Sequence, residues 1–488
     1  MVTTHPAPDR TADPAAGLAA DLAADLAAQL PAGRISTDGD VLAGCRTDQE
    51  NAPWGPPALL ARPLSTQDVA TIVRFGYQRG VPIVPRGSGT GLTGGCNAIS
   101  GCIVLGLERM NRIREINVAE RYAVVEPGVL NQQLRDAAAG HRLWYPPDPS
   151  SKDACSLGGN VATNAGGLCC VRYGVTKDYV LALEVVTGTG AVIRLGHRTA
   201  KRSVGPDLAA LFVGSEGCLG VITEITLRLR PLPGPAATVV CGFATAAEAA
   251  AAAVALRGAG VQPEVCELMD ERTVAAVEEL MPLGLPAASG ALLLLQVDGD
   301  AAADAARAVL DGCRATWTYR STSAQEGEQL FTARRRAFEA VRRHGRVTTE
   351  DVCVPLAAVG PVLARIQEVG RRLGVDIATV AHAGDGNLHP MIIDDGTVAP
   401  TVLAGAFTEI IDVALQAGGT VSGEHGVGLL KRDAGMRELG DPVVELSSRL
   451  KAVFDPRWIL NPGKGPFRAP AAAPAAGRSG RRRREGTP

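Results

Sequence analysis

Histidines and a carboxylate in two short segments have the residue types of a metal-assisted acid–base site. The first segment, VAHAGDGNLHP, carries His382 and His389 on either side of Asp385-Gly386. An Asp-Gly pair between apolar residues signals a two-residue hairpin turn, which would place the histidines opposite each other with Cβ atoms about 5 Å apart. The imidazoles then suit one metal ion, unless they share the hairpin by accident. Pro390 cannot donate to a sheet ladder, so we expect this strand end to be an edge.

The second segment, SGEHGVG at 422–428, adds a carboxylate and a third imidazole. Glu424 and His425 are adjacent, so on extended backbone their side chains point apart. Glu424 can then complete a set of two imidazoles and one carboxylate, while His425 faces a reacting group. The chain has 7 histidines, and three of them lie in these two segments. Nitrogen and oxygen ligands with open positions favour Zn²⁺, with Mn²⁺ or Fe²⁺ as alternatives.

A glycine-rich loop, PRGSGTGLTGG at 85–95, follows a short apolar run. Its glycines have the G-x-G-x-x-G spacing of a dinucleotide-binding turn. A Rossmann unit needs a long helix directly after that turn, but this chain continues through GCNAISG into a second apolar run, CIVLGL. The loop is therefore either a flexible connection or a phosphate-binding nest of another fold, in which backbone N–H groups, Arg86 and Ser88 are the donors.

Two further glycine-rich stretches lie nearby. The stretch YPPDPSSKDACSLGGNVATNAGG (145–167) is too long for a tight turn, and its Asn160, Thr163 and Asn164 can hydrogen-bond a heterocycle or hydroxyl groups. The third stretch, GSEGCLGVITE (214–224), precedes a strand pattern. Three such stretches in one region favour a single large ligand wrapped by backbone, and hence a nucleotide cofactor.

The elements that must position these segments follow two patterns. Between 55 and 232, short strands dominate, and residues 65–80 predict a helix capped by Ser65 and ended by Gly80. After a Pro/Gly break at 231–235, alanine-rich helices alternate with strands from 236 to 418, which indicates an α+β layer. We place an N-terminal helical segment at 1–54, domains at 55–232 and 236–418, a C-terminal segment at 419–466 and a disordered basic tail at 467–488.

Composition excludes several classes of protein. The 488 residues are 46% hydrophobic and carry a net charge of −2, so we expect a globular protein without the basic face of a nucleic-acid binder. No apolar run of about 18 residues predicts a transmembrane helix, and no signal peptide is evident. The 11 cysteines include no C-x-x-C pair, which argues against a disulfide framework and against an iron–sulfur site.

Taken together and in order, these segments resemble the vanillyl-alcohol-oxidase/PCMH family of FAD proteins, in its D-2-hydroxyacid dehydrogenase and glycolate-oxidase large-subunit branch. The resemblance runs from about 40 to 466, and YGVTKDYVLALEVV and LNPGK contribute to it as well. It implies an α+β fold with a two-part PCMH-type FAD-binding domain, a cap domain for substrate, and a C-terminal segment that returns to the flavin.

The resemblance also implies where FAD binds. We expect non-covalent FAD, because no histidine lies between 86 and 140 or near LNPGK. The implied contacts are Pro85, Arg86, Gly87, Ser88, Gly89, Thr90, Gly91, Gly94 and Gly95 for the pyrophosphate; Pro147, Asp148, Ser156, Gly158, Gly159, Asn160, Thr163, Asn164 and Gly166 for the flavin; Glu216, Gly217 and Ile222 for adenine and ribose; and Asn461 over the ring.

In the same branch, the two hairpin histidines and Glu424 would be the metal ligands, and His425 the base. Arg334, in FTARRRAF, matches the arginine that binds the substrate carboxylate in this branch. Its planar guanidinium group can donate two parallel hydrogen bonds to a carboxylate. Asn387 would orient the substrate. The expected reaction is oxidation of a D-2-hydroxyacid to the 2-oxoacid by hydride transfer to flavin N5. Phe338 and Thr349 stand where the hydroxyglutarate branch holds a second carboxylate, so we favour D-lactate or glycolate over D-2-hydroxyglutarate.

The chain contains no iron–sulfur or haem motif, so reduced flavin would need an external electron acceptor: a partner subunit, a quinone, a cytochrome or oxygen. A flavin-bearing subunit that turns over only inside a complex is therefore one alternative. A metal-binding module without flavin is another. We expect a cytoplasmic protein that meets a membrane only peripherally, through its acceptor, and a homodimer stays open.

Overall fold

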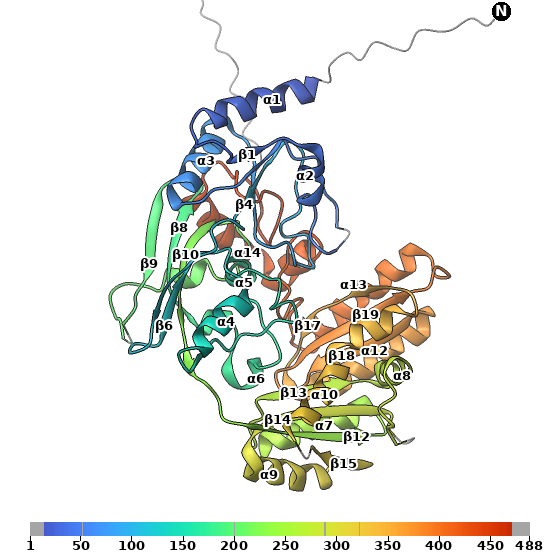
Figure 1. Cartoon of the computed structure of the whole chain (residues 1–488). Helices are drawn as coiled ribbons and strands as arrows, with labels where there is room; N and C mark the ends of the chain where they lie inside the picture. Colours follow the sequence, from blue (N-terminus) through green and yellow to red (C-terminus); the bar gives the residue numbers. More distant parts are fainter. Residues whose placement is uncertain (1–13, 51, 200, 287–288, 322, 471–488) are drawn as a thin grey trace, which may run out of the picture.

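The structure, a computed structural model, describes residues 14–470 except positions 51, 200, 287, 288 and 322. The predicted basic tail beyond 470 and residues 1–13 lie outside the described residues. Figure 1 shows two bodies, one from the N-terminal half of the chain and one around a large sheet that begins with β12. Both contain helices and strands, and the predicted α+β fold class is confirmed.

The first body contains a four-stranded sheet, β1-β2-β4-β3, and a five-stranded sheet, β5-β6-β10-β8-β9. Its strands are β1 Ile35–Ser36, β2 Leu59–Ala61, β3 Ile83–Arg86, β4 Ile103–Gly106, β5 Ile113–Asn117, β6 Tyr122–Val125, β8 Val180–Thr187, β9 Val192–Gly196 and β10 Gly220–Arg228, with β7 Leu143–Trp144 and β11 Arg230–Pro231 paired separately. Its helices are α1 Pro14–Ala27, α2 Gly39–Gly44, α3 Thr66–Arg79, α4 Asn131–Ala139, α5 Leu157–Thr163, α6 Cys170–Tyr173, and the 3₁₀ turns η1 Thr176–Asp178 and η2 Ala209–Leu211.

Helix α3 forms where the sequence predicts it. The Ser65 side chain accepts the Asp68 N–H, and Gly80 ends the helix in the left-handed conformation, with φ of 68°. Its apolar face, which includes Ile72 and Val73, packs against strands of the four-stranded sheet. The helix therefore fixes the position of β3, the strand that leads directly into the first glycine-rich loop.

The large sheet has eight strands, in the order β15-β12-β14-β13-β18-β19-β16 with β17 also paired to β19. They are β12 Ala236–Phe243, β13 Val265–Met269, β14 Ala291–Asp298, β15 Trp317–Arg320, β16 Arg346–Thr349, β17 Val352–Cys353, β18 Asp376–His382 and β19 Asn387–Asp394. The helices of this half are α7 Ala246–Gly258, α8 Glu271–Leu280, α9 Gly299–Asp311, α10 Ala324–Arg335, α11 Ala337–Arg342, η3 Leu356–Ala358, α12 Val359–Leu373 and α13 Pro400–Gln416.

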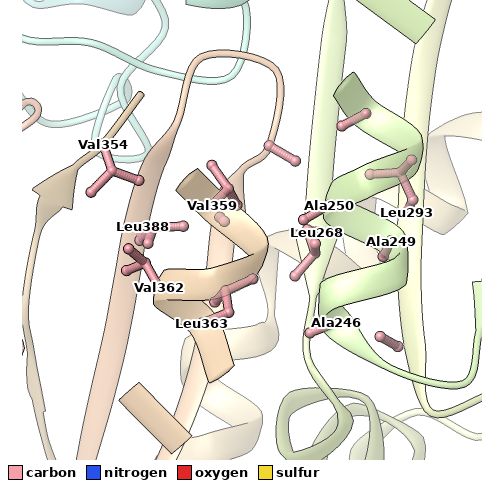
Figure 2. Packing of buried hydrophobic residues seen from close by; sticks show 14 of the residues in the cluster. Ala246, Ala249, Ala250, Leu268, Leu293, Val354, Val359, Val362, Leu363 and Leu388 are labelled. Atoms are coloured by element: carbon pink, nitrogen blue, oxygen red, sulfur yellow. The ribbon is translucent and has the colours of Figure 1, made fainter. Parts of the chain in front are cut away.

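Helices cover both faces of the large sheet. Alternate residues of β14 belong to different clusters: Leu293 packs with α7 and α12, and Leu292 packs with α8 and α11 on the other face. The continuous apolar run ALLLLQV is therefore a strand buried on both sides. Figure 2 shows alanines of α7 facing Val359, Val362 and neighbouring residues. These small side chains leave room for α12 to approach α7 closely.

The hairpin of β18 and β19 differs from its predicted register. His382 pairs with Asn387, and His389 pairs with Val380, so a four-residue connection replaces the predicted two-residue turn. The N–H groups of Asp385 and Gly386 both donate to the His382 carbonyl, and Gly386 takes a φ of 89° to close this longer turn. The pairing moves by two residues, which keeps both histidines on one face because side chains alternate with period two.

The predicted sheet edge at Pro390 is wrong as well. Strand β19 has β18 on one side and β16 and β17 on the other. The Pro390 carbonyl accepts the Glu350 N–H, in the interval between β16 and β17. The ring nitrogen of Pro390 faces the same side as this carbonyl, where the neighbouring strand is interrupted. An interior strand thus tolerates a proline at that position.

The last segment returns to the first body. Helix α14, Arg432–Phe454, bends at Gly440, where φ is 72°. Beyond it, the Ile83 N–H donates to the Ile459 carbonyl and the Asn461 N–H donates to the Ile83 carbonyl, so the C-terminal segment lies beside β3. None of the described helices has the length and apolar character needed to span a bilayer.

Leu293→Ala tests the core of the large sheet. The side chain is fully buried, so we expect the substitution to reduce the free energy of unfolding by about 2–5 kcal/mol through lost burial and a residual cavity. Leu446→Ala, at a side chain that is 59% exposed, is the matched control and should change it by less than about 0.5 kcal/mol. Denaturant unfolding measures both, and equal effects would contradict the packing described here.

Candidate active site

An elongated cavity lies between the three glycine-rich stretches and the SGEHGVG loop, which is residues 422–428. Its empty volume is about 1360 Å³, which includes the space open to solvent at its entrance. Most of the predicted cofactor residues line it, and so do Glu424 and His425. The predicted residues in its wall are Pro85, Arg86, Gly87, Ser88, Gly89, Thr90, Gly91, Gly95, Ser156, Gly158, Gly159, Asn160, Thr163, Gly166, Glu216, Gly217 and Ile222.

Five predicted cofactor residues do not line the cavity, but they make hydrogen bonds or end a helix in the segments that form its wall. The Gly94 N–H donates to Asp48, and Asp148 accepts the Cys169 N–H. Asn164 caps the end of α5 with φ of 54°. The remaining two are Pro147 and Asn461. The Pro147 carbonyl accepts a hydrogen bond from the Asn131 side chain, and the side-chain amide of Asn461 donates to the carbonyls of Gly95 and Glu216. Contact with a bound ligand stays a prediction for all five.

Close packing explains the glycines of the first loop. A Cβ at Gly87 would lie 2.4 Å from Ser156 Oγ, and Gly89 has φ of 75°, a conformation that other residues rarely adopt. Lys464 stabilises the loop, because its buried ammonium group donates hydrogen bonds to the Gly95 and Asn97 carbonyls. Sequence analysis missed this role, although Lys464 lies in the LNPGK motif.

The second stretch contains a short helix that the sequence did not predict. Helix α5 begins after Ser156, whose side chain accepts the Gly159 N–H. Asn160 is buried, and its side-chain amide oxygen accepts a hydrogen bond from the side-chain amide of Asn131. Part of its hydrogen-bonding capacity is therefore used within the protein.

The hairpin histidines and Glu424 form a compact cluster. His382 Nε2 lies 3.4 Å from Glu424 Oε1, and His389 Nε2 lies 3.3 Å from the same oxygen. The two rings are perpendicular, with centroids 5.1 Å apart. The possible ligand atoms all lie within 4.8 Å of one another, and both histidines are buried. Despite the altered hairpin register, the structure brings together the three predicted metal ligands.

His425 does not point away from Glu424 as predicted. Its Nε2 lies 3.9 Å from Glu424 Oε1, and its ring stacks on His389 with centroids 5.2 Å apart. The backbone is bent, because Asp351 Oδ2 accepts the N–H groups of both Glu424 and His425. Adjacent side chains point apart only on extended backbone, so both residues here reach the same end of the cavity.

Two buried acids that sequence analysis missed lie behind the imidazoles. Glu267 Oε1 is 2.6 Å from His382 Nδ1, and Asp351 Oδ1 is 4.0 Å from His389 Nδ1. Both acids are fully buried. A signal for Glu267 was available, because it is the one charged residue in the apolar strand VCELM. Carboxylates behind ligand histidines commonly fix the ring orientation.

The charged groups of this cluster shift one another's pKa values strongly. Burial lowers the pKa of His382, but the carboxylates of Glu267 and Glu424 outweigh burial and raise this pKa well above its usual value. Burial raises the pKa of Glu424, yet hydrogen bonds to His382 and His389 bring it well below the usual range. For His425, burial dominates and lowers the pKa, although Asp351 opposes that effect.

The donor set fits a divalent cation. Two imidazole nitrogens and one carboxylate oxygen converge, and a metal ion would balance the excess of buried acid. The neighbouring Asn387 also has a buried amide oxygen without a hydrogen-bond partner among the described residues, so this oxygen is available to a ligand.

Of the remaining predicted residues, Arg334 and Asn387 lie beside the cluster. Arg334 is 9% exposed, and its Nη2 lies 2.7 Å from Glu267 Oε2. Asn387 is directly opposite His382 in the sheet, with its side chain against the backbone of Gly423. Phe338 lies at the surface at the start of α11, and Thr349 is partly buried in β16.

Gly87→Ala tests the first loop as a binding element for FAD, the cofactor that the resemblance implies. The new methyl group would collide with Ser156 Oγ, and overpacking of about 1–3 kcal/mol corresponds to a roughly 5- to 150-fold higher dissociation constant for FAD. Equilibrium titration of the apoprotein with FAD measures this. Gly405→Ala, at a position where a Cβ would have no atom within 4 Å, is the control and should bind FAD like the wild type. No change in Gly87→Ala would contradict the packing.

Comparison with known proteins agrees with this geometry. A model of FAD binding domains matches residues 57–196, and a model of FAD-linked oxidase C-terminal domains matches residues 232–465. The glycolate oxidase subunit GlcD of Bacillus subtilis is 37% identical over 84% of this chain and 88% of its own length. The D-lactate dehydrogenase of Archaeoglobus fulgidus is 34% identical over 83% of this chain and 90% of its own length.

The fold has a close counterpart among solved structures. A substrate-bound p-cresol methylhydroxylase superposes with a TM-score of 0.77 at 18% identity, over 92% of this chain and 97% of that one. The predicted architecture, a PCMH-type FAD-binding domain with a second α+β domain and a returning C-terminal segment, is confirmed. The chain belongs to the FAD-linked oxidases of the vanillyl-alcohol-oxidase/PCMH family, in the branch of the glycolate oxidase GlcD subunits and D-lactate dehydrogenases.

Proposed function

We propose that this chain oxidises a small D-2-hydroxyacid, with D-lactate or glycolate favoured, to the 2-oxoacid. One observation carries the proposal: Glu424 and His425 line the same cavity as the glycine-rich stretches, and Glu424 also contacts the two hairpin histidines. A cofactor ring beside these two residues would lie next to both a base and a metal-ligand set. The names of the two relatives, a glycolate oxidase subunit and a D-lactate dehydrogenase, support the same class of reaction.

FAD would lie in the cavity, non-covalently, with its pyrophosphate at the Gly87–Gly91 loop and its flavin toward α5 and the SGEHGVG loop. Gly158 lets α5 pack closely against Pro127, because a Cβ at this position would lie 2.6 Å from Pro127. When bound, FAD supplies the N5 atom that accepts a hydride. The surrounding protein positions the ring and excludes water from it.

His425 is the proposed general base. Its ring lines the cavity and stacks on His389, while its backbone N–H is fixed by Asp351. Burial lowers the pKa of this imidazole, which favours the neutral form that accepts a proton. His425 would take the hydroxyl proton of the substrate as the Cα hydrogen departs.

His382, His389 and Glu424 would hold a divalent cation, Zn²⁺ or Mn²⁺. Such an ion acts as a Lewis acid and lowers the pKa of a hydroxyl group that it binds. Arg334 would bind the substrate carboxylate: one of its nitrogens is paired with Glu267, and its side chain retains 11% exposure. Asn387, with its unpaired amide oxygen, would orient the substrate.

Two positions support a substrate with one carboxylate. Phe338 and Thr349 carry no charge, and Phe338 is 42% exposed with Arg342 over its ring. Neither side chain can itself pair with a second carboxylate, as a lysine or a hydroxyl donor at the matching positions of the hydroxyglutarate branch would. We therefore expect D-2-hydroxyglutarate to bind less well than an acid with one carboxylate.

A second candidate is a flavin-bearing subunit that turns over only with partner proteins. The Bacillus subtilis relative is named as a subunit, and this chain covers 88% of its length. In either case electrons would leave to an external acceptor. The two candidates differ in whether the isolated chain reduces an artificial dye.

A substrate screen tests the proposal. The purified protein should be yellow, and anaerobic D-lactate or glycolate should bleach its flavin, whereas D-2-hydroxyglutarate should do so at least ten times more slowly. Absorbance of the oxidised flavin is the readout. Bleaching without dye reduction would favour the subunit candidate. A folded preparation that takes up no FAD would contradict the proposal.

His425→Ala tests the base. Loss of general-base catalysis should lower the rate of flavin reduction about 10²- to 10⁴-fold, while FAD and metal content should stay near wild-type levels because the variant retains the glycine-rich wall and all three proposed metal ligands. Stopped-flow absorbance and metal analysis measure these quantities. His197→Ala, at an exposed histidine of the first body, is the control and should reduce flavin normally. A near-wild-type rate in His425→Ala would contradict the assignment.

A further inference from the structure

Glu267 is a fully buried carboxylate in the middle of the large sheet. It lies in β13, which is buried along its whole length, and it is directly opposite His382 of β18. Directly opposed residues of an antiparallel pair project from the same face, and Figure 1 shows β13 and β18 as neighbours. The register of these two strands therefore places the carboxylate against the imidazole.

Each oxygen of Glu267 has a different partner. Oε1 lies 2.6 Å from His382 Nδ1, and Oε2 lies 2.7 Å from Arg334 Nη2. These partners come from different elements, β18 and α10. One carboxylate thus joins a proposed metal ligand to the proposed substrate-carboxylate arginine.

The contact with Nδ1 determines what the other ring nitrogen can do. A neutral imidazole that donates from Nδ1 carries its lone pair on Nε2. The Nε2 atom of His382 faces Glu424, within the cluster. The carboxylate consequently selects the tautomer in which His382 can ligate a cation there.

We infer that Glu267 is a positioning residue that fixes His382 for metal binding and Arg334 for the substrate carboxylate. The part that concerns the substrate rests on the proposed function. The part that concerns the metal rests on the contacts of Glu267 and on the donor set. Glutamine at this position cannot serve both partners, because its amide nitrogen would face a second donor.

The experiment compares Glu267→Gln with Glu264→Gln in the FAD-loaded full chain. Glu264 is the matched control, since it is also buried and paired with an arginine, Arg172, but contacts no imidazole. Equilibrium dialysis against Zn²⁺ buffered by a competing chelator gives the dissociation constant. We expect Zn²⁺ to bind Glu267→Gln about 10- to 100-fold more weakly than wild type, and Glu264→Gln to bind it like wild type. The KM for the acid should also rise in Glu267→Gln.

Each outcome decides the inference. A Zn²⁺ dissociation constant in Glu267→Gln within threefold of wild type overturns it. Equal weakening in both variants also overturns it, because a general loss of sheet stability then explains the effect. A wild-type protein that binds no divalent metal defeats both the inference and the metal part of the proposed function. If Glu267→Gln does not fold, Glu267→Asp keeps the charge but shortens its reach, and wild-type Zn²⁺ affinity in that variant overturns the inference.

Discussion

The SGEHGVG loop is held between two carboxylates, one from each body of the protein. Asp351, between β16 and β17, is fully buried and accepts hydrogen bonds from the Ser422 hydroxyl and from the N–H groups of Glu424 and His425 through one oxygen. Glu216, from the first body, is partly buried and accepts hydrogen bonds from the N–H groups of residues 427 and 428. A buried carboxylate is costly unless donors surround it, so Asp351 in particular requires this loop in place.

This double anchor explains why the cofactor cavity and the histidine cluster meet. The hairpin histidines belong to the large sheet, whereas the glycine-rich wall belongs to the first body. The loop contacts both, and its bent backbone places Glu424 and His425 close together. Lys431 secures the same region, because its buried ammonium donates to the Asp351 and Val421 carbonyls and pairs with Glu350.

The sequence predicted much of this arrangement and missed what depends on long-range packing. Local signals, such as the Ser65 cap and the apolar run of β14, gave the correct elements. Hairpin register failed because the Asp-Gly signal does not specify loop length, although a two-residue error still placed the histidines on one face. Glu267 could have been suspected as the one charged residue of an apolar strand, but its partner His382 could not, because the sequence does not show which strand will pair with which. Asp351 was missed for the same reason.

Placing the reactive groups between two bodies has a chemical consequence. The first body can form the glycine-rich wall, and the large sheet can hold two imidazoles, but neither contains the whole donor set. Glu424 completes that set only when Asp351 and Glu216 hold the loop from opposite sides. Apart from the Ser422 hydroxyl, the donors to these two acids are backbone N–H groups, so the anchors mainly constrain the path of the chain rather than the identity of its side chains. The side chains of Glu424 and His425 thus determine the chemistry, and the hydrogen bonds from the loop backbone to Asp351 and Glu216 determine where these side chains lie.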